Sequence, residues 1–233
     1  MPAAPDRSLG DGWWQCVAVT PQRRPLWLAV VGSPRHPGGS RVELLAAAAE
    51  REVGADAAAV AEFDDEGRVV RLRPGPSTAV VDAEPWFAEI QETSGRPPAT
   101  NLVAFAGPER RPHELVDEAA LADTGVVSAD QLAAVRWYPA TGEVDQIYVQ
   151  PAWRRRRIGS VLVAAAAALS YARGWPRLWS DGQRTDLGER FRNASPWRAR
   201  TADLTHLAPP MTPGEAPPSA AGGPGATRPS ASS

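Results

Sequence analysis

Short apolar runs alternate with longer amphipathic segments along this chain. The short runs are bounded by Gly, Pro or polar residues, and they predict strands over 25–32, 67–74, 100–107 and 176–180. The longer segments carry helix start and stop residues, and they predict helices over 40–54, 83–95, 112–125 and 184–194. This mixture predicts an α/β fold of the mixed, α+β kind.

The clearest local pattern is a hairpin followed by a helix. Two β-like runs, Leu132–Tyr138 and Val144–Val149, are joined by Pro-Ala-Thr-Gly-Glu, which is typical of a hairpin loop. Four arginines then precede an alanine-rich run from Ile158 to Ala172, which predicts a helix that ends at Gly174. The run is too short to span a bilayer, so we expect the helix to be buried in the protein core.

The composition of the chain also predicts its organisation. Residues 1–11 and 208–233 are small, polar or Pro-rich, and we expect both to be disordered tails. Residues 100–207 then form the core domain. Residues 12–99 form an N-terminal α/β segment that either joins this domain or stands apart.

Charge and cysteine content exclude several classes of function. The formal net charge is −2, which argues against a general affinity for nucleic acid or membranes. The chain has no lysine, so any mechanism that needs a lysine side chain is excluded. A single cysteine and three dispersed histidines predict neither a disulfide nor a metal site, and they fit a cytoplasmic protein. The N-terminus also lacks the apolar stretch of a secretory signal.

The four arginines, Arg154 to Arg157, stand where positive charge is unfavourable. The first amides of a helix have no acceptor within it, and the helix dipole makes this end positive. A bound phosphate or pyrophosphate would reverse the sign of the interaction, because both amides and guanidinium groups bind it. A solvated basic turn, or a patch that meets an acidic protein or nucleic acid, remains the alternative.

The segment IYVQPAWRRRRIGSVL resembles the acetyl-CoA motif of the GNAT N-acetyltransferase superfamily. In that motif a strand is followed by Q/R-x-x-G-x-G/A, which opens a helix. Arg154 takes the Q/R position and Gly159 the second small position, while Arg157 stands where the family has glycine. A side chain at 157 that points outward would leave its amide accessible, and one that points inward would weaken or block cofactor binding. The clear resemblance covers about 130–195.

The resemblance implies a central, mostly antiparallel sheet flanked by helices, splayed between the strands at about 144–149 and 177–180. It also implies that acetyl-CoA is the cosubstrate. The strand edge would bind the pantetheine arm through its backbone, at Ile147, Tyr148 and Val149. The following loop and helix start would bind the pyrophosphate, at Arg154, Arg155, Arg156, Arg157, Ile158, Gly159 and Ser160.

Acetyl transfer to an amine needs a group that accepts a proton. In this family an acid on the strand before the loop often serves as the base, which points to Asp145, with Glu143 as second choice. The family's usual general acid is a tyrosine on the last helix, but the matching region has Phe191 and no tyrosine. The polar segment around Asp181, Arg184 and Asp186 is either a substrate-binding loop or a capped turn that leads into a helix. We expect none of these residues to bind a metal ion.

The sequence therefore predicts a GNAT-like N-acetyltransferase whose acceptor is a small-molecule or peptide amine. Neither nucleic acid nor a membrane is an expected partner, and a homodimer is left open. The alternatives are an inactive GNAT-like module that binds CoA or a protein, and an interaction protein whose arginines meet an acidic partner.

Overall fold

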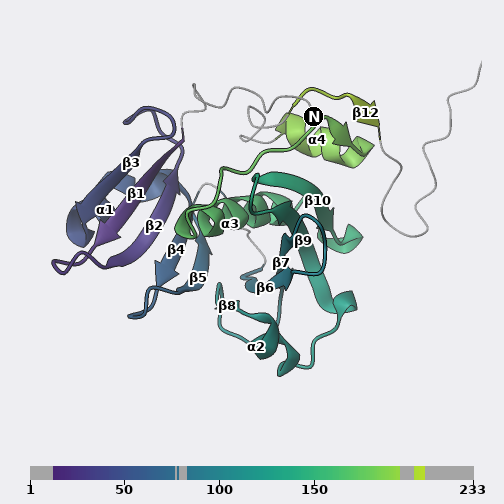
Figure 1. Cartoon of the computed structure of the whole chain (residues 1–233), viewed down its shortest axis with the longest axis horizontal. Coiled ribbons are helices and arrows are strands. Elements are labelled where there is room, and N and C mark those ends of the chain that lie inside the picture. Colours follow the sequence, from purple (N-terminus) through teal and green to yellow (C-terminus); the bar gives the residue numbers. More distant parts are fainter. Residues whose placement is uncertain (1–12, 77, 79–82, 195–201, 208–233) are drawn as a thin grey trace, which may run out of the picture.

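The computed structural model describes residues 13–76, 78, 83–194 and 202–207. The two predicted tails lie outside these residues. Two five-stranded sheets enclose one long helix, α3 (Ile158–Ala172), which lies between them in Figure 1. The fold is mixed α/β, and most of its strand pairs are antiparallel, as the sequence predicts.

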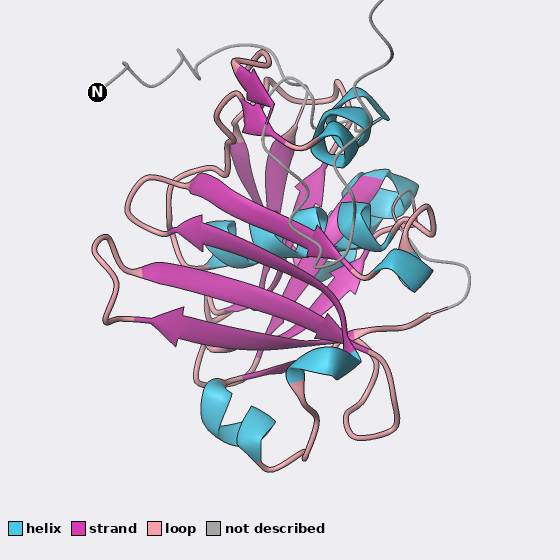
Figure 2. Ribbon diagram, turned by 90° about the vertical axis from the view of Figure 1, so that its right-hand side faces the viewer, coloured by secondary structure: helices cyan, strands magenta, loops and turns pink. Residues whose placement is uncertain are grey.

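The first sheet has the order β3-β1-β2-β4-β5. Its strands are β1 (Trp14–Val19), β2 (Pro25–Val31), β3 (Arg41–Leu45), β4 (Ala57–Phe63) and β5 (Val69–Pro74). The second sheet has the order β10-β9-β7-β6-β8 and lies in front of α3 in Figure 2. Its strands are β6 (Trp86–Glu92), β7 (Ala99–Phe105), β8 (Leu115–Val116), β9 (Gln131–Tyr138) and β10 (Glu143–Val149).

The remaining elements are short. They are α1 (Ala46–Val53), α2 (Glu118–Ala122), α4 (Asp186–Ala194), the 3-10 turns Gly54–Asp56, Ser128–Asp130 and Pro151–Trp153, and the two-residue strands β11 (Gln183–Arg184) and β12 (His206–Leu207).

Helix α3 is buried on nearly all sides, which explains its composition. One apolar cluster joins α3 to residues of both sheets, such as Leu28 and Leu72 on one side and Phe87 and Trp137 on the other. A helix that is apolar all round belongs in the interior of a protein. The small alanine side chains keep helix α3 narrow, so both sheets can pack closely against it.

A short connecting segment ties the two sheets together. The Leu72 amide of β5 donates to the His113 carbonyl (2.8 Å), and the Phe87 amide of β6 donates to the Glu114 carbonyl (2.8 Å). Residues 113–114 thus lie between the two sheets and bond to both. The N-terminal segment is therefore packed onto the rest of the fold through α3 and this connection.

Three predicted elements differ from the structure. The start of the predicted helix 40–54 is strand β3, because Val42 and Leu44 turn inward while the residues between them are exposed. The predicted helix 83–95 is strand β6, buried on both faces at its start, so no alternation marked it as a strand. Within 112–125 only α2 is helical, capped by Asp117, which accepts from the Ala120 amide (2.8 Å). Strands β1 and β4 were not predicted.

The predicted strand 176–180 is also reduced. Only a parallel bridge between Trp179 and Glu143 connects it with β10. The other predicted strands match β2, β5, β7, β9 and β10, and the predicted last helix matches α4.

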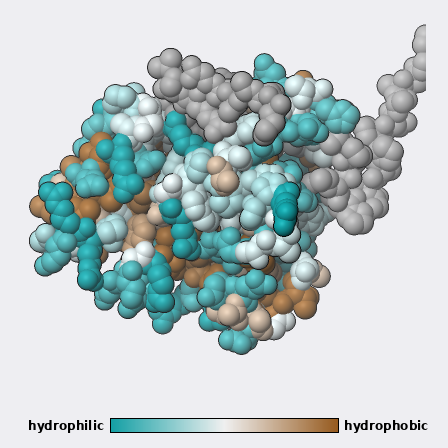
Figure 3. All heavy atoms as spheres, viewed as in Figure 1, coloured by the Kyte–Doolittle hydropathy of each residue, from teal (hydrophilic) through white to brown (hydrophobic). Residues whose placement is uncertain are grey.

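Hydrophobic side chains are not confined to the interior. Figure 3 shows a group of them over the end of the first sheet where α1 and β3 lie. Leu45, at the end of β3, is 60% exposed. The rest of this face is largely polar, and the part of the chain that is described has no helix long and apolar enough to cross a membrane.

Candidate active site

Strand β10 and the segment before α4 begin as neighbours and then separate. The Val144 amide donates to the Trp179 carbonyl (2.7 Å), and the Trp179 amide donates to the Gly142 carbonyl (2.9 Å). The bridge at Glu143 and Trp179 is the only one between them in the described residues. The two segments therefore splay apart after Val144, as the sequence predicts.

The edge of β10 is open along the predicted pantetheine-binding residues. β10 is the last strand of its sheet and pairs with β9, with Ile147 opposite Val135 and Val149 opposite Ala133. Its other side has no strand partner beyond the bridge, within the residues described. An extended chain can add to such an edge through backbone hydrogen bonds.

A β-bulge interrupts β10 at Asp145. The register with β9 shifts between Val144 and Gln146, so Asp145 has no directly opposite partner. A bulge turns the side chains of a strand and is often found beside an active site. Here the bulge lies one residue after the last backbone bond to Trp179, where the splay opens.

The loop of four arginines turns from β10 into α3 in a strained conformation. Arg155 and Arg157 have φ values of 62° and 65°, in the left-handed region. An L-residue other than glycine is strained there by about 1–2 kcal/mol. Such strain persists only where the surrounding structure imposes it, and it gathers at functional sites.

The two arginines thus adopt the backbone conformation for which glycine is the usual residue. Alternation of left-handed and other residues can gather successive amides into a concave anion-binding nest, and residues 154–160 are our candidate for one. The nest continues into the first turn of α3, where the amides of Ile158, Gly159 and Ser160 have no acceptor within the helix. Arg157 is exposed, so its side chain is not packed into the protein core over this turn.

The other two arginines shape the loop. The Arg154 guanidinium donates from Nε to the Val149 carbonyl (3.1 Å), which fixes the loop to the end of β10. The guanidinium of Arg156 lies over the ring of Trp153, 5.1 Å from its centroid. The sequence predicted that Arg154 adds charge for a pyrophosphate. In the structure it also holds the turn that forms the nest.

Helix α4 approaches the start of α3 closely. A Cβ atom added at Gly159 would lie 3.2 Å from Cε2 of Phe191 and 3.5 Å from Cγ2 of Val149. Glycine at 159 therefore lets α4 and β10 meet over the first turn of α3. Phe191 thus lies beside the candidate site. It stands in the helix where the GNAT resemblance implies a tyrosine as the general acid.

Asp145 is held by an arginine that sequence analysis did not single out. Its carboxylate forms an ion pair with Arg136, which also binds Glu92 through Nε (3.1 Å) and Nη2 (2.9 Å). Arg136 alternates along β9 with Val135 and Trp137, which pack toward α3, so the cluster lies on the opposite face of the sheet. Arg136 lowers the pKa of Glu92, helped by the amide of Asn101.

No sequence signal could have revealed this cluster. Glu92 and Arg136 lie 44 positions apart, and only the pairing of β6, β7, β9 and β10 brings them onto one face. The predicted second choice, Glu143, lies at the bridge to Trp179, on the rim of the splay.

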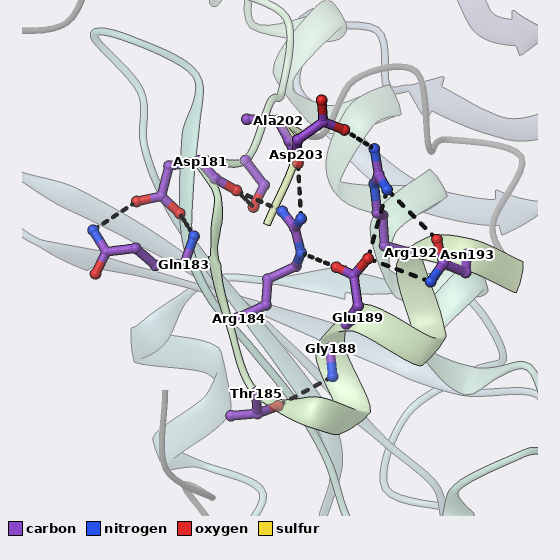
Figure 4. A network of polar contacts seen from close by, with 11 residues as sticks. Asp181, Gln183, Arg184, Thr185, Gly188, Glu189, Arg192, Asn193, Ala202 and Asp203 are labelled. Carbon is purple, nitrogen blue, oxygen red and sulfur yellow. Dashed lines mark hydrogen bonds and ion pairs between the residues drawn. The ribbon is translucent and has the colours of Figure 1, made fainter. Parts of the chain in front are cut away.

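The polar segment 181–189 forms a network of hydrogen bonds and ion pairs (Figure 4). Arg184 is 8% exposed; it donates to the carbonyls of Asp181 (2.6 Å) and Ala202 (2.7 Å) and pairs with Glu189 (2.8 Å). Arg184 lowers the pKa of Glu189 by this hydrogen bond. The segment does form a capped turn into α4, with the Thr185 hydroxyl accepting from the Gly188 amide (3.1 Å), and its part in substrate binding stays a prediction.

The structure thus brings the predicted donor-binding residues together at one corner, where β10, the arginine loop and α3 meet. Asp145 lies earlier on β10, at the bulge near the hairpin end of the strand. Among the described residues, no group of three or more His, Cys, Asp or Glu side chains could hold a metal ion.

This corner combines a splayed strand pair, a bulged edge strand and the first amides of a helix. Residues 82–188, a little under half of the chain, match the model of the acetyltransferase (GNAT) family, which supports membership of the GNAT superfamily. No curated protein and no solved structure matches the chain.

Proposed function

We propose that this protein is an N-acetyltransferase that moves an acetyl group from acetyl-CoA to an amine by direct attack. The observation that carries the proposal is the nest at 154–160, formed by two arginines in the left-handed conformation at the start of α3. Family membership supports the same reaction class.

The donor fits the residues that line this corner. Backbone groups of Ile147, Tyr148 and Val149 would bind the pantetheine arm along the open edge of β10. The nest and the arginines from Arg154 to Arg157 would bind the pyrophosphate, which removes the unfavourable charge at the helix start. The acetyl group would then lie in the splay beside the bulge.

The acceptor would approach the splay from the face that carries Asp145. An amine attacks only in its neutral form, so a carboxylate must accept its proton, directly or through water. Asp145 is our candidate for this role. Since the described part of α4 has Phe191 and no tyrosine, the thiolate would leave unprotonated or take its proton from water.

A non-catalytic CoA-binding module is the second candidate. Two observations favour it: the Asp145 carboxylate is already ion-paired with Arg136, and Phe191 offers no proton. This candidate keeps donor binding and predicts no turnover.

Calorimetric titration with acetyl-CoA tests the donor. We expect saturable binding by the wild type, binding weakened at least tenfold in Arg154→Ala, and none in Gly159→Trp, whose indole would fill the space above the first turn of α3. Arg71→Gln on β5 is the control and should bind normally. Absence of binding by the folded wild type would remove the donor and the proposal.

Thiol release from acetyl-CoA with a panel of small and peptide amines tests the reaction. Turnover that falls by about 10²-fold or more in Asp145→Asn supports the transferase. Binding of acetyl-CoA without turnover on any amine would leave only the second candidate.

A further inference from the structure

Arg136 is the centre of a polar ladder that crosses the second sheet. The side-chain amide of Asn101 donates to Glu92 Oε1, and Glu92 Oε2 accepts from Nε and Nη2 of Arg136. Nη1 of Arg136 donates to the Tyr138 hydroxyl (3.1 Å) and to Asp145 Oδ2. The ladder therefore links β6, β7, β9 and β10 on the face away from α3.

The ladder holds Arg136 more firmly than a surface ion pair would. Its side chain is 21% exposed, whereas those of Glu92 and Asp145 are each 41% exposed. The ring of Tyr138 also lies beneath its guanidinium, 5.2 Å from the centroid. The conformational entropy of a guanidinium side chain is lost when its first partner binds. A planar guanidinium bound from several sides can therefore orient its further partners at little extra cost.

The partner at the open end of the ladder is Asp145. This residue lies in the bulge, where it has no backbone pairing with β9 to fix its position. Its carboxylate therefore depends on Arg136 for its orientation. Glu92 binds the far side of Arg136 and so sets the direction in which Nη1 points.

We propose that Arg136 is a positioning residue that acts through Asp145: it aims the carboxylate at the acceptor beside the splay, and Glu92 holds Arg136 in place. This inference rests on the proposed function, because it assigns Arg136 a part in amine activation. Arg136 itself touches neither donor nor acceptor in this scheme.

A double-mutant cycle on acetyl transfer tests the inference. We expect Arg136→Gln to lower kcat about tenfold with the Kd for acetyl-CoA unchanged, because the donor site lies on other residues. In an Asp145→Asn background the same change should alter kcat less than about twofold, because the group through which Arg136 acts has gone.

Three further variants sharpen the cycle. Arg136→Lys should recover part of the activity, since it keeps a cation without the planar fork. Glu92→Leu should lower kcat less than Arg136→Gln does, and this loss should also vanish in the Asp145→Asn background. Arg71→Gln is the matched control, because Arg71 also spans strands of a sheet and its partner Glu62 retains Arg73.

The outcomes separate the two proposals. Equal losses from Arg136→Gln in both backgrounds, in an active wild type, would overturn the positioning role and leave the transferase intact. A wild type that binds acetyl-CoA and acetylates nothing would overturn both. A weakened Kd for acetyl-CoA in folded Arg136→Gln would overturn the role as well, because Arg136 would then act on the donor.

Discussion

The two ends of helix α3 share one backbone feature and differ in almost everything else. At each end a residue adopts the left-handed conformation, Arg157 with a φ of 65° and Gly174 with a φ of 70°. Glycine is the residue that accepts this conformation without strain, and it is the usual choice at the end of a helix. Only the C-terminal end has it.

The charges at the two ends differ in the same way. At the C-terminal end Arg173 meets the negative pole of the helix and pairs with Glu89 (2.7 Å), whose side chain is 9% exposed. At the N-terminal end four arginines meet the positive pole, where no acidic residue lies in the first turn. The C-terminal end is stabilised by an ion pair within the protein, whereas the N-terminal end is where we propose that a pyrophosphate binds.

The largest expected effect is a loss of stability when the ion pair at the C-terminal end of α3 is removed. Arg173→Ala leaves the Glu89 carboxylate without its cation in a mostly buried place, so we expect the free energy of unfolding to fall by about 2 kcal/mol. Arg156→Ala, at the other end, is the control and should change it by less than about 0.5 kcal/mol. Urea unfolding measures both, and equal effects would contradict the distinction between the ends.

The second largest effect is a gain in folding stability at the N-terminal end of α3. Arg157→Gly removes the left-handed strain from the N-terminal end, so we expect the protein to be more stable by about 1 kcal/mol. Arg157→Ala removes the same guanidinium but keeps the Cβ atom and the strain, so it should gain none of that energy. A thermal melt of the ligand-free protein compares them, and a destabilised Arg157→Gly variant would show that the arginine is structural.

A smaller effect tests the left-handed position at the other end. Gly174→Ala places a Cβ atom where nothing lies within 4 Å, so only backbone strain opposes it. We expect a loss of about 0.7 kcal/mol, because the strain exceeds the entropy that alanine removes from the unfolded chain. Chemical unfolding measures it, and acetyl-CoA affinity should be unchanged.

The smallest effect concerns the connection between the sheets that enclose both ends. Burial lowers the pKa of His113 below 6.5. Below pH 6.5 the unfolded chain therefore binds more protons at this residue than the folded chain, so folding stability falls as the pH falls toward the folded pKa. Stability should drop less between pH 7.5 and 5.5 in His113→Asn, which tolerates the φ of 65°, as measured by urea midpoints. An unchanged drop would place the acid sensitivity elsewhere.

Local signals predicted much of the second half of the fold. The hairpin, α3 and its stop at Gly174 were correct because turn residues and apolar runs act over a few positions. The helix predicted over 83–95 was wrong because β6 takes its conformation from its neighbour β7, and its first residues are buried on both faces. The strand β3 was missed for a related reason, since pairing with β1 overrides the helical tendency of the residues that follow.

One part of the candidate site could be predicted from the sequence and the other part could not. The donor-binding residues lie within 147–160, so a contiguous motif could indicate them, and their roles stay predictions. The Glu92–Arg136–Asp145 ladder joins three strands, and nothing in the sequence connects its members.

The sequence by itself determined the hairpin, the apolar helix and the arginine loop, because each depends on the preferences of adjacent residues. Only the tertiary structure decided that α3 is enclosed by two sheets, that Arg155 and Arg157 are strained, and that Arg136 holds Asp145. These features arise from contacts between strands far apart in the chain, and such contacts leave no periodic trace in the order of residues.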